Sequence, residues 1–135
     1  MRFLRCTNPE FIPRTLLKQL PNKDFDADSF YTFMGVALQS PTSLLFLLID
    51  EKNVIRGFLW AEINVLEQVM FVNLLSVDKE LWGNGSAIDL ATDFLKKRFV
   101  ELSLKKVVWI TDRPALFERK GFKQAKEVLL EYTGE

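Results

Sequence analysis

The distribution of hydrophobic residues along the chain indicates both helices and strands. Between Ser86 and Leu102 the apolar residues recur every three or four positions and charged residues occupy the opposite side, which predicts an amphipathic helix. By contrast, residues 44–49 are apolar without interruption, which is typical of a strand that is covered on both faces. The polar residues 50–53 that follow this run predict a turn.

Shorter patterns predict the other elements. Residues 54–66 and 69–77 have the pattern of strands, and only Glu67 and Gln68 separate them, which favours a tight antiparallel hairpin. The remaining predicted elements are strands at 2–6 and 106–111, an irregular turn at Asn8-Pro9, helices at about 13–20, from Asp26 or Asp28 to Pro41 and at about 114–120, and a last extended segment at 122–132. This order predicts a single domain over residues 1–135 of the α+β or mixed α/β class, with helices flanking a central sheet.

Composition narrows the classes of function. Lys plus Arg and Asp plus Glu number 18 each, so the zero net charge gives no general attraction to nucleic acid or to an anionic membrane. The chain has one cysteine, Cys6, and no histidine, which excludes disulfide frameworks, Cys/His zinc sites and Ser-His or Cys-His nucleophilic pairs. We expect no metal site, and because no apolar run is long enough to span a bilayer, we expect a soluble protein of the cytoplasm.

The candidate binding site lies where the predicted strand 69–77 leads into the long helix. The stretch Trp82-Gly83-Asn84-Gly85-Ser86-Ala87 combines two glycines with two small residues. Small side chains let another molecule approach the main chain closely, and the first turn of a helix offers N–H groups and a partial positive charge. The sequence therefore predicts an anion site here, most plausibly for a phosphate.

Two segments in this order of elements resemble the GCN5-related N-acetyltransferase superfamily. Trp82 to Ala87 matches its cofactor motif, which is Gln or Arg, two residues, Gly, one residue, and Gly or Ala; residues 112–122 are similar to a later element ending in Tyr-Glu-Lys-X-Gly-Phe. The resemblance covers nearly the whole chain and implies a mostly antiparallel sheet with an acetyl-CoA site where the fourth and fifth strands separate. It also implies that the main chain of Gly83, Asn84, Gly85, Ser86 and Ala87 holds the pyrophosphate, and that the backbone of Leu75, Ser76 and Val77 bonds the pantetheine arm.

The sequence departs from the family pattern at two cofactor positions. Trp82 replaces Gln or Arg, so its indole N–H is left as the donor to phosphate, and the alternative is that its ring packs against the helix. Phe117 occupies the place where many members have the tyrosine that returns a proton to the CoA thiolate. A phenyl ring donates no proton, so an enzyme without this donor would be slower or would use water. The alternative for Phe117 is an ordinary place in the core.

No carboxylate stands at the family's usual base position, which falls at Phe71. Asn73 points to the same face without being a base, and Glu62 on the neighbouring strand is the nearest substitute. Partial burial among Trp60, Ala61 and Ile63 would raise the pKa of Glu62 and suit it to accept a proton from an amine, although a lone strand glutamate often faces solvent.

Two further groups of residues bear on the acceptor. Phe25, Phe30, Tyr31 and Phe33 either line an apolar acceptor pocket or form core. Similarly, Asp24, Asp26 and Asp28 either attract a cationic amine or form a solvated loop with a helix cap.

Two functions remain open at this stage. The first is an N-acetyltransferase that moves an acetyl group from acetyl-CoA to a primary amine, a small molecule or a protein, by direct attack in a ternary complex. The second is a weakened relative that serves as an acyl-CoA-binding or assembly module without turnover. Because related folds add two strands after the last helix and only residues 122–132 are available, we also expect exposed strand edges to pair between subunits in a homodimer.

Overall fold

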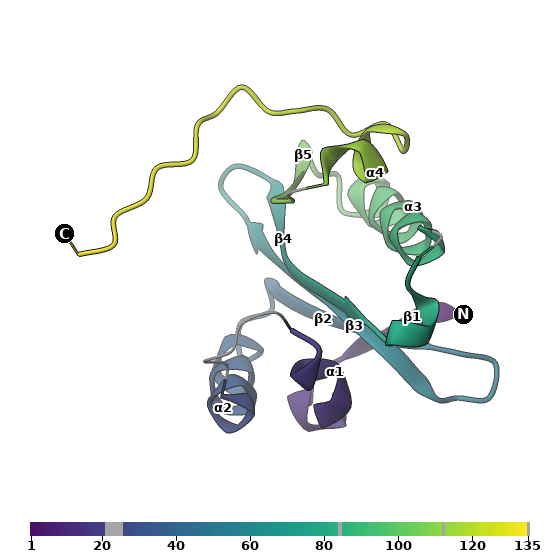
Figure 1. The fold of residues 1–135 in the computed structure, drawn as a ribbon. Helices are drawn as coiled ribbons and strands as arrows, with labels where there is room; N and C mark the ends of the chain where they lie inside the picture. Colours follow the sequence, from purple (N-terminus) through teal and green to yellow (C-terminus); the bar gives the residue numbers. More distant parts are fainter. Residues whose placement is uncertain (21–25, 84, 112, 135) are drawn as a thin grey trace.

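The computed structural model, which describes residues 1–20, 26–83, 85–111 and 113–134, is built around one five-stranded sheet (Figure 1). The strands stand side by side in chain order: β1 (Arg2–Cys6), β2 (Ser43–Ile49), β3 (Ile55–Asn64), β4 (Val69–Val77) and β5 (Lys106–Trp109). Neighbouring strands are antiparallel except β4 and β5, which are parallel because a long helix connects them. The predicted class, a mixed and mostly antiparallel sheet flanked by helices, is confirmed.

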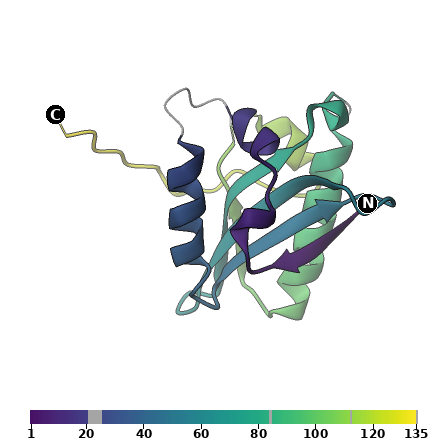
Figure 2. The same cartoon turned by 90° about the horizontal axis from the view of Figure 1, so that it is seen from below.

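The helices cover the two faces of this sheet separately (Figures 1 and 2). One face carries the short 3-10 helix η1 (Pro9–Phe11), α1 (Arg14–Lys18) and α2 (Ala27–Ala37). The other carries α3 (Ser86–Glu101) and α4 (Pro114–Glu118), and a second 3-10 helix, η2 (Lys79–Leu81), links β4 to α3. None of the helices within the described ranges is long and apolar enough to cross a membrane.

Strand alternation builds a separate apolar core on each face. On the α3 face, Phe46, Leu59 and Met70 pack around Leu95 of the helix. On the α1 and α2 face, Leu45, Leu47 and Phe58 pack against the buried Ile12, Leu16 and Leu17. Because β2 supplies alternate residues to both cores, its apolar run has no polar position, as predicted.

The boundary between β4 and β5 is the feature that positions the site. β5 pairs with β4 only from Val69 to Val72, opposite Lys106 to Trp109. The register against β3 shifts at the next residue: Ala61 pairs with Val72 and Trp60 with Leu74, which leaves Asn73 as an extra residue in a β-bulge. Beyond the bulge β4 continues to Val77 without β5 beside it.

Several predicted elements are shorter in the structure, and one is absent. The predicted helix 13–20 contracts to Arg14–Lys18 behind the N-cap Pro13, and the predicted strands 54–66 and 106–111 contract to β3 and β5. The predicted last strand is wrong: residues 122–134 form no strand and are almost entirely exposed. A pattern of apolar residues makes a strand only where another strand offers hydrogen bonds, and this segment has none beside it in the described structure.

Candidate functional site

Beyond Asn73, the main chain of β4 faces the opening that is left where β5 no longer pairs with β4. The N–H of Asp78 donates to Arg56 O at 2.7 Å. In an antiparallel pair every second residue bonds the neighbouring strand, so at this end of β4 Asp78 and Ser76 direct their main-chain groups to β3. By that alternation, Leu75 and Val77 direct their N–H and C=O groups away from β3, toward the side that β5 has left. An extended ligand arm laid here meets main-chain donors and acceptors, as an added strand does.

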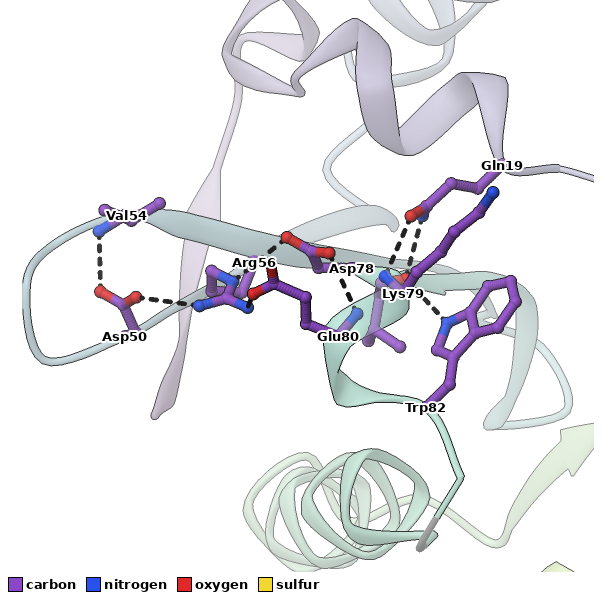
Figure 3. Close-up of polar contacts among 9 residues, drawn as sticks. Gln19, Asp50, Val54, Arg56, Asp78, Lys79, Glu80 and Trp82 are labelled. Carbon is purple, nitrogen blue, oxygen red and sulfur yellow. Dashed lines mark hydrogen bonds and ion pairs between the residues drawn. The ribbon is translucent and has the colours of Figure 1, made fainter.

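At Val77 the protein itself occupies the outward carbonyl (Figure 3). Gln19 Nε2 and the indole N–H of Trp82 both donate to Val77 O, each at 3.0 Å, and Gln19 Oε1 accepts from the Lys79 N–H at 3.0 Å. The expectation that the backbone of Leu75, Ser76 and Val77 bonds a pantetheine arm therefore does not extend to the Val77 carbonyl in this conformation. It stays a prediction for Leu75 and for the Val77 N–H.

This arrangement also changes the interpretation of Trp82 and Ser76. The Trp82 N–H donates to Val77 O in this conformation and is therefore not available as a donor to a ligand, and the side chain is 55% exposed. The Ser76 hydroxyl donates to Leu16 O at 3.1 Å and ties β4 to α1. Neither side chain is turned toward the glycine loop.

A single arginine organises the end of the sheet next to the opening (Figure 3). Arg56 on β3 lies 3.5 Å from Asp50, 3.4 Å from Asp78 and 2.9 Å from Glu80. Asp50 also accepts hydrogen bonds from the N–H groups of Val54 and Lys52, and these bonds together with Arg56 hold the pKa of that carboxyl below its usual range. The network fixes the turn between β2 and β3 to the start of η2.

The glycine loop has the backbone that the motif predicts. Gly83 and Gly85 have positive φ angles of 107° and 74°, which favour glycine, and Gly85 is the N-cap of α3. A Cβ at Gly83 would meet nothing within 4 Å, so the space outside this residue is open. Asn84 lies outside the described residues. Ala87 in the first turn is buried against Leu48 and Val77, which joins the helix start to the end of β4.

Arg119 lies against this loop, although no sequence pattern pointed to it. Its guanidinium donates to Gly85 O at 3.3 Å and pairs with Asp89 of α3 at 2.7 Å. A Cβ at Gly85 would come within 2.5 Å of the same guanidinium, so the position suits only glycine while Arg119 stays there. The side chain of Arg119 remains 43% exposed. A cation at the end of α4 thus lies beside the loop, although Arg119 and Gly85 are 34 residues apart in sequence.

Phe117, in the last turn of α4, packs between two other aromatic rings. Its ring centroid lies 4.5 Å from that of Trp109 and 5.9 Å from that of Phe122, and the side chain is 6% exposed. Of the two interpretations left open by the sequence, the packing supports an ordinary place in the core.

Glu62 and Asn73 come together on the other face of the sheet, beside the bulge. The Asn73 Nδ2 donates to Glu62 Oε1 at 2.7 Å, and Phe71, directly across from Glu62, is 41% exposed. Of the two alternatives for Glu62, the structure has the solvent-facing one: the side chain is exposed, while Ala61 and Ile63 face the α3 core. The pair nevertheless forms an accessible carboxylate held by an amide at the edge of the opening.

Among the described aromatic and acidic residues near α2, Phe30, Tyr31, Asp26 and Asp28 have structural roles. Phe30 packs 6.1 Å from Phe58, and the Tyr31 hydroxyl donates to Ile12 O, whereas Phe33 is 73% exposed. Asp26 caps α2: bonds from the Ser29 hydroxyl and the Asp28 N–H keep its pKa low. Asp28 pairs with Arg14. Asp24 and Phe25 lie outside the described residues.

Comparisons with solved structures identify the fold. A spermidine N-acetyltransferase chimera from Vibrio cholerae and hSSAT superposes with a TM-score of 0.73 at 21% identity, over 97% of this chain and 86% of that chain. Glucosamine-6-phosphate N-acetyltransferase from Arabidopsis thaliana gives 0.69 at 14% identity, over 97% of each chain. AAC(6')-Iy, solved with the bisubstrate analogue CoA-S-monomethyl-acetylneamine, gives 0.68 at 18% identity, over 89% of this chain and 88% of that chain.

No family model matches the sequence, and no curated protein matches it. The similarity is therefore carried by structure at low sequence identity. The superpositions cover nearly the full length of this chain and therefore identify its architecture. The chain has the fold of the GCN5-related N-acetyltransferases.

Proposed function

We propose that this protein is an N-acetyltransferase that moves an acetyl group from acetyl-CoA to a primary amine. The observation that carries the proposal is the opening beside β4: the strand loses β5 after Val72 and then leads through η2 and the glycine loop into α3. The edge of β4 that β5 leaves unpaired therefore lies in line with the N-terminus of α3. Such a combination suits a ligand that has an extended amide-containing arm and a diphosphate.

The residues present fit that ligand. The main chain of Gly85, Ser86 and Ala87 lies at the positive end of α3, and Gly83 has open space outside it. Arg119 adds a cation within reach of the same loop. The outward N–H and C=O groups of Leu75 and the N–H of Val77 would pair with the arm, while acetyl-CoA supplies the thioester.

On the acceptor side, Glu62 is the candidate proton acceptor. Its carboxylate lies at the bulge where β4 and β5 separate, and the Asn73 amide holds one of its oxygens. A neutral amine is needed to attack a thioester, and a carboxylate that takes the amine's proton, directly or through water, provides it. Neighbouring folds named as acting on spermidine or glucosamine-6-phosphate support an amine as the acceptor class.

Isothermal titration with acetyl-CoA, followed by thiol release over a panel of primary amines, tests the proposal. We expect saturable binding to one site per chain and release of CoA thiol that depends on the amine. Desulfo-CoA serves as the control ligand, because it keeps the diphosphate and cannot carry the acetyl group. No binding at millimolar acetyl-CoA would count against acetyl-CoA as the ligand and against acetyl transfer to an amine.

One observation favours a second candidate, an acyl-CoA-binding module without turnover. Phe117 fills the position of the family's proton donor and is buried between Trp109 and Phe122. Saturable acetyl-CoA binding without thiol release from any amine of the panel would select this candidate over the transferase.

A further inference from the structure

Three side chains form a row across the sheet next to the point where β4 and β5 separate. Glu62 on β3 lies directly across from Phe71 on β4, and Phe71 lies directly across from Val108 on β5. The last pair of β4 and β5, Val72 and Trp109, follows immediately. The row therefore borders the opening that the proposed function assigns to the thioester of acetyl-CoA.

The side chains of this row point to the face of the sheet opposite α3. The residues on either side of each one in the chain pack in the core on the α3 face: Ala61 and Ile63, Met70 and Val72, and Val107 and Trp109. By strand alternation, the row faces the other way. Neither Phe71 nor Val108 belongs to an apolar cluster of the described residues, and Phe71 is 41% exposed. The row is thus an apolar strip with a carboxylate at one end.

This strip matches a primary amine with a carbon body. From Glu62 to Val108 the row covers two strand spacings, about 10 Å. The Asn73 amide holds Glu62 Oε1 at 2.7 Å, and the exposed carboxylate retains Oε2 for an ammonium group. A carbon chain that continues from this ammonium lies over Phe71 and Val108. Burial of its methylene groups against these two side chains stabilises the bound amine.

The strand positions that flank the row offer no second carboxylate. The residues two positions away along the three strands are Trp60, Asn64, Val69, Asn73, Lys106 and Ile110. The described acidic residues near α2 already have partners, because Asp26 caps α2 and Asp28 pairs with Arg14. A second ammonium on the same ligand would therefore lie over apolar side chains without a counter-charge, which is unfavourable.

The far end of the row opens into a positively charged cavity. Val108 also lines a cavity of about 1020 Å³ whose walls are residues 105–111 and residues 121–127. The lining contains five lysines and two glutamates, and one of these glutamates, Glu127, pairs with Lys106 at 3.1 Å. A second ammonium carried past Val108 would meet an excess of like charge. Desolvation and repulsion thus both act against a ligand with two cationic ends.

We propose that the acceptor is a primary monoamine with an apolar body, bound by Glu62 at its ammonium and by Phe71 and Val108 along its carbon chain. The row discriminates against diamines and polyamines, because it provides a carboxylate at one end and lysines at the other. The inference rests on the proposed function for the identity of this surface as an acceptor site. The binding of the amine is nevertheless measurable without turnover.

Titration calorimetry with excess CoA in the cell tests the proposal. Hexylamine and 1,6-diaminohexane have the same carbon chain and differ in the charge of the far end, and spermidine adds a longer polycation. We expect hexylamine to bind at least about tenfold more tightly than either polycation, because the far ammonium has no counter-charge. Equal or tighter binding of either polycation overturns the proposal, and so does the absence of hexylamine binding.

Two variants test the residues of the row. Val108→Glu supplies the carboxylate that the far ammonium lacks and should remove the preference for hexylamine. Val100→Glu adds the same charge at a position of α3 that is 73% exposed, and it should leave the preference as it is. Phe71→Ser should weaken hexylamine binding about fivefold or more, with methylamine binding unchanged, because apolar contact area is lost.

Circular dichroism identifies the variants that fold, and the two variants test the row independently. A preference for hexylamine that survives in folded Val108→Glu overturns the proposal. Hexylamine binding that is unaffected in Phe71→Ser overturns it as well.

Thiol release with acetyl-CoA separates this inference from the proposed function. Hexylamine that binds with the expected selectivity but releases no CoA thiol supports the monoamine site and contradicts the transferase. Thiol release that is more efficient with spermidine than with hexylamine supports the transferase and overturns the monoamine site.

Discussion

At the scale of single residues, Glu62 and Asn73 give the most direct test of chemistry. Glu62→Gln keeps the shape of the side chain and its contact with Asn73 but removes the proton acceptor. We expect kcat/KM for the amine to fall by at least about 100-fold, the lower end of what a placed base contributes, with acetyl-CoA affinity unchanged. Initial-rate kinetics with titration calorimetry measure both. Glu67→Gln, in the turn between β3 and β4, is the control, and equal losses in the two variants would exclude Glu62 as the base.

Arg119 carries the second residue-scale prediction. Arg119→Gln removes the charge beside Gly85 and retains a neutral hydrogen-bond donor on a shorter side chain. We expect acetyl-CoA affinity to fall about tenfold, corresponding to about 1.4 kcal/mol, because a charge-assisted contact to phosphate is replaced by a neutral one. Arg113→Gln, an exposed cation at the start of α4, should leave binding unchanged. If Arg119→Gln binds acetyl-CoA as the wild type does, Arg119 serves only to pair with Asp89.

The sequence predicted some site residues and not others, for a physical reason. The glycines of the loop are recognisable because their backbone role depends on neighbouring residues in the chain. Gln19 and Arg119 reach the site across 58 and 34 residues of sequence, and nothing local marks them. Trp82 was identified as a departure, but its bond to Val77 O depends on how η2 turns, which no residue pattern specifies.

At the scale of elements, two glycines give predictions of opposite sign. Gly57 on β3 lies so close to β4 that a Cβ would meet Ser76 O at 2.7 Å and Val77 Cγ1 at 2.9 Å. Gly57→Ala should therefore lower the free energy of unfolding by about 1–3 kcal/mol, because backbone must move. Gly35→Ala, inside α2 with its nearest contact at 4.0 Å, should raise that free energy by about 0.5–1 kcal/mol. Urea denaturation measures the free energy of unfolding of both variants. A Gly57→Ala variant as stable as the wild type would show that the backbone at the end of β4 shifts without cost.

Asp50, in the turn between β2 and β3, makes the free energy of unfolding depend on pH. The folded pKa of Asp50 is lowered by the N–H groups of Val54 and Lys52 and by Arg56. Its stabilising contribution is therefore fully present above the unfolded pKa of ~3.9 and is lost as pH falls through the lower folded value. We expect Asp50→Asn to be less stable than the wild type at pH 7 and to lose less stability between pH 5 and 2. Urea midpoints over that range measure it, with Glu51→Gln as the control; parallel curves for Asp50→Asn and wild type would contradict the expectation.

The elements that the sequence predicted well are those whose hydrophobic pattern alone determines their structure. α3 and β2 were predicted within a residue or two, because their hydrophobic patterns are complete in themselves. β5 was predicted too long, and the strand expected after Gly121 does not form, because a strand also needs a neighbouring strand and the sequence does not show whether one is present. A related limit applies to α3: the four-residue spacing of Asp93 and Lys97 favours a pair along the helix, but the Asp93 carboxylate lies 2.8 Å from the ammonium of Lys120, just after α4.

At the scale of the whole molecule, the two faces of the sheet meet at the end of β4. Ser76 and Gln19 tie that end to α1 on one face, and Val77 packs against Ala87 of α3 on the other. A ligand bound along this stretch would contact the one region where both cores are joined. Binding there should stabilise the entire chain and not one helix alone.

That coupling predicts a thermal response to acetyl-CoA. At a free concentration 100 times its dissociation constant, the ligand stabilises the folded chain by about 2.7 kcal/mol. For a chain of 135 residues this corresponds to a rise of roughly 10 °C in melting temperature, seen as one cooperative transition. Differential scanning calorimetry checks it, and Arg119→Gln at the same concentration should shift less because fewer of its sites are filled. A melting temperature that does not respond to acetyl-CoA would contradict both the proposed ligand and its placement at the end of β4, where the two cores are joined.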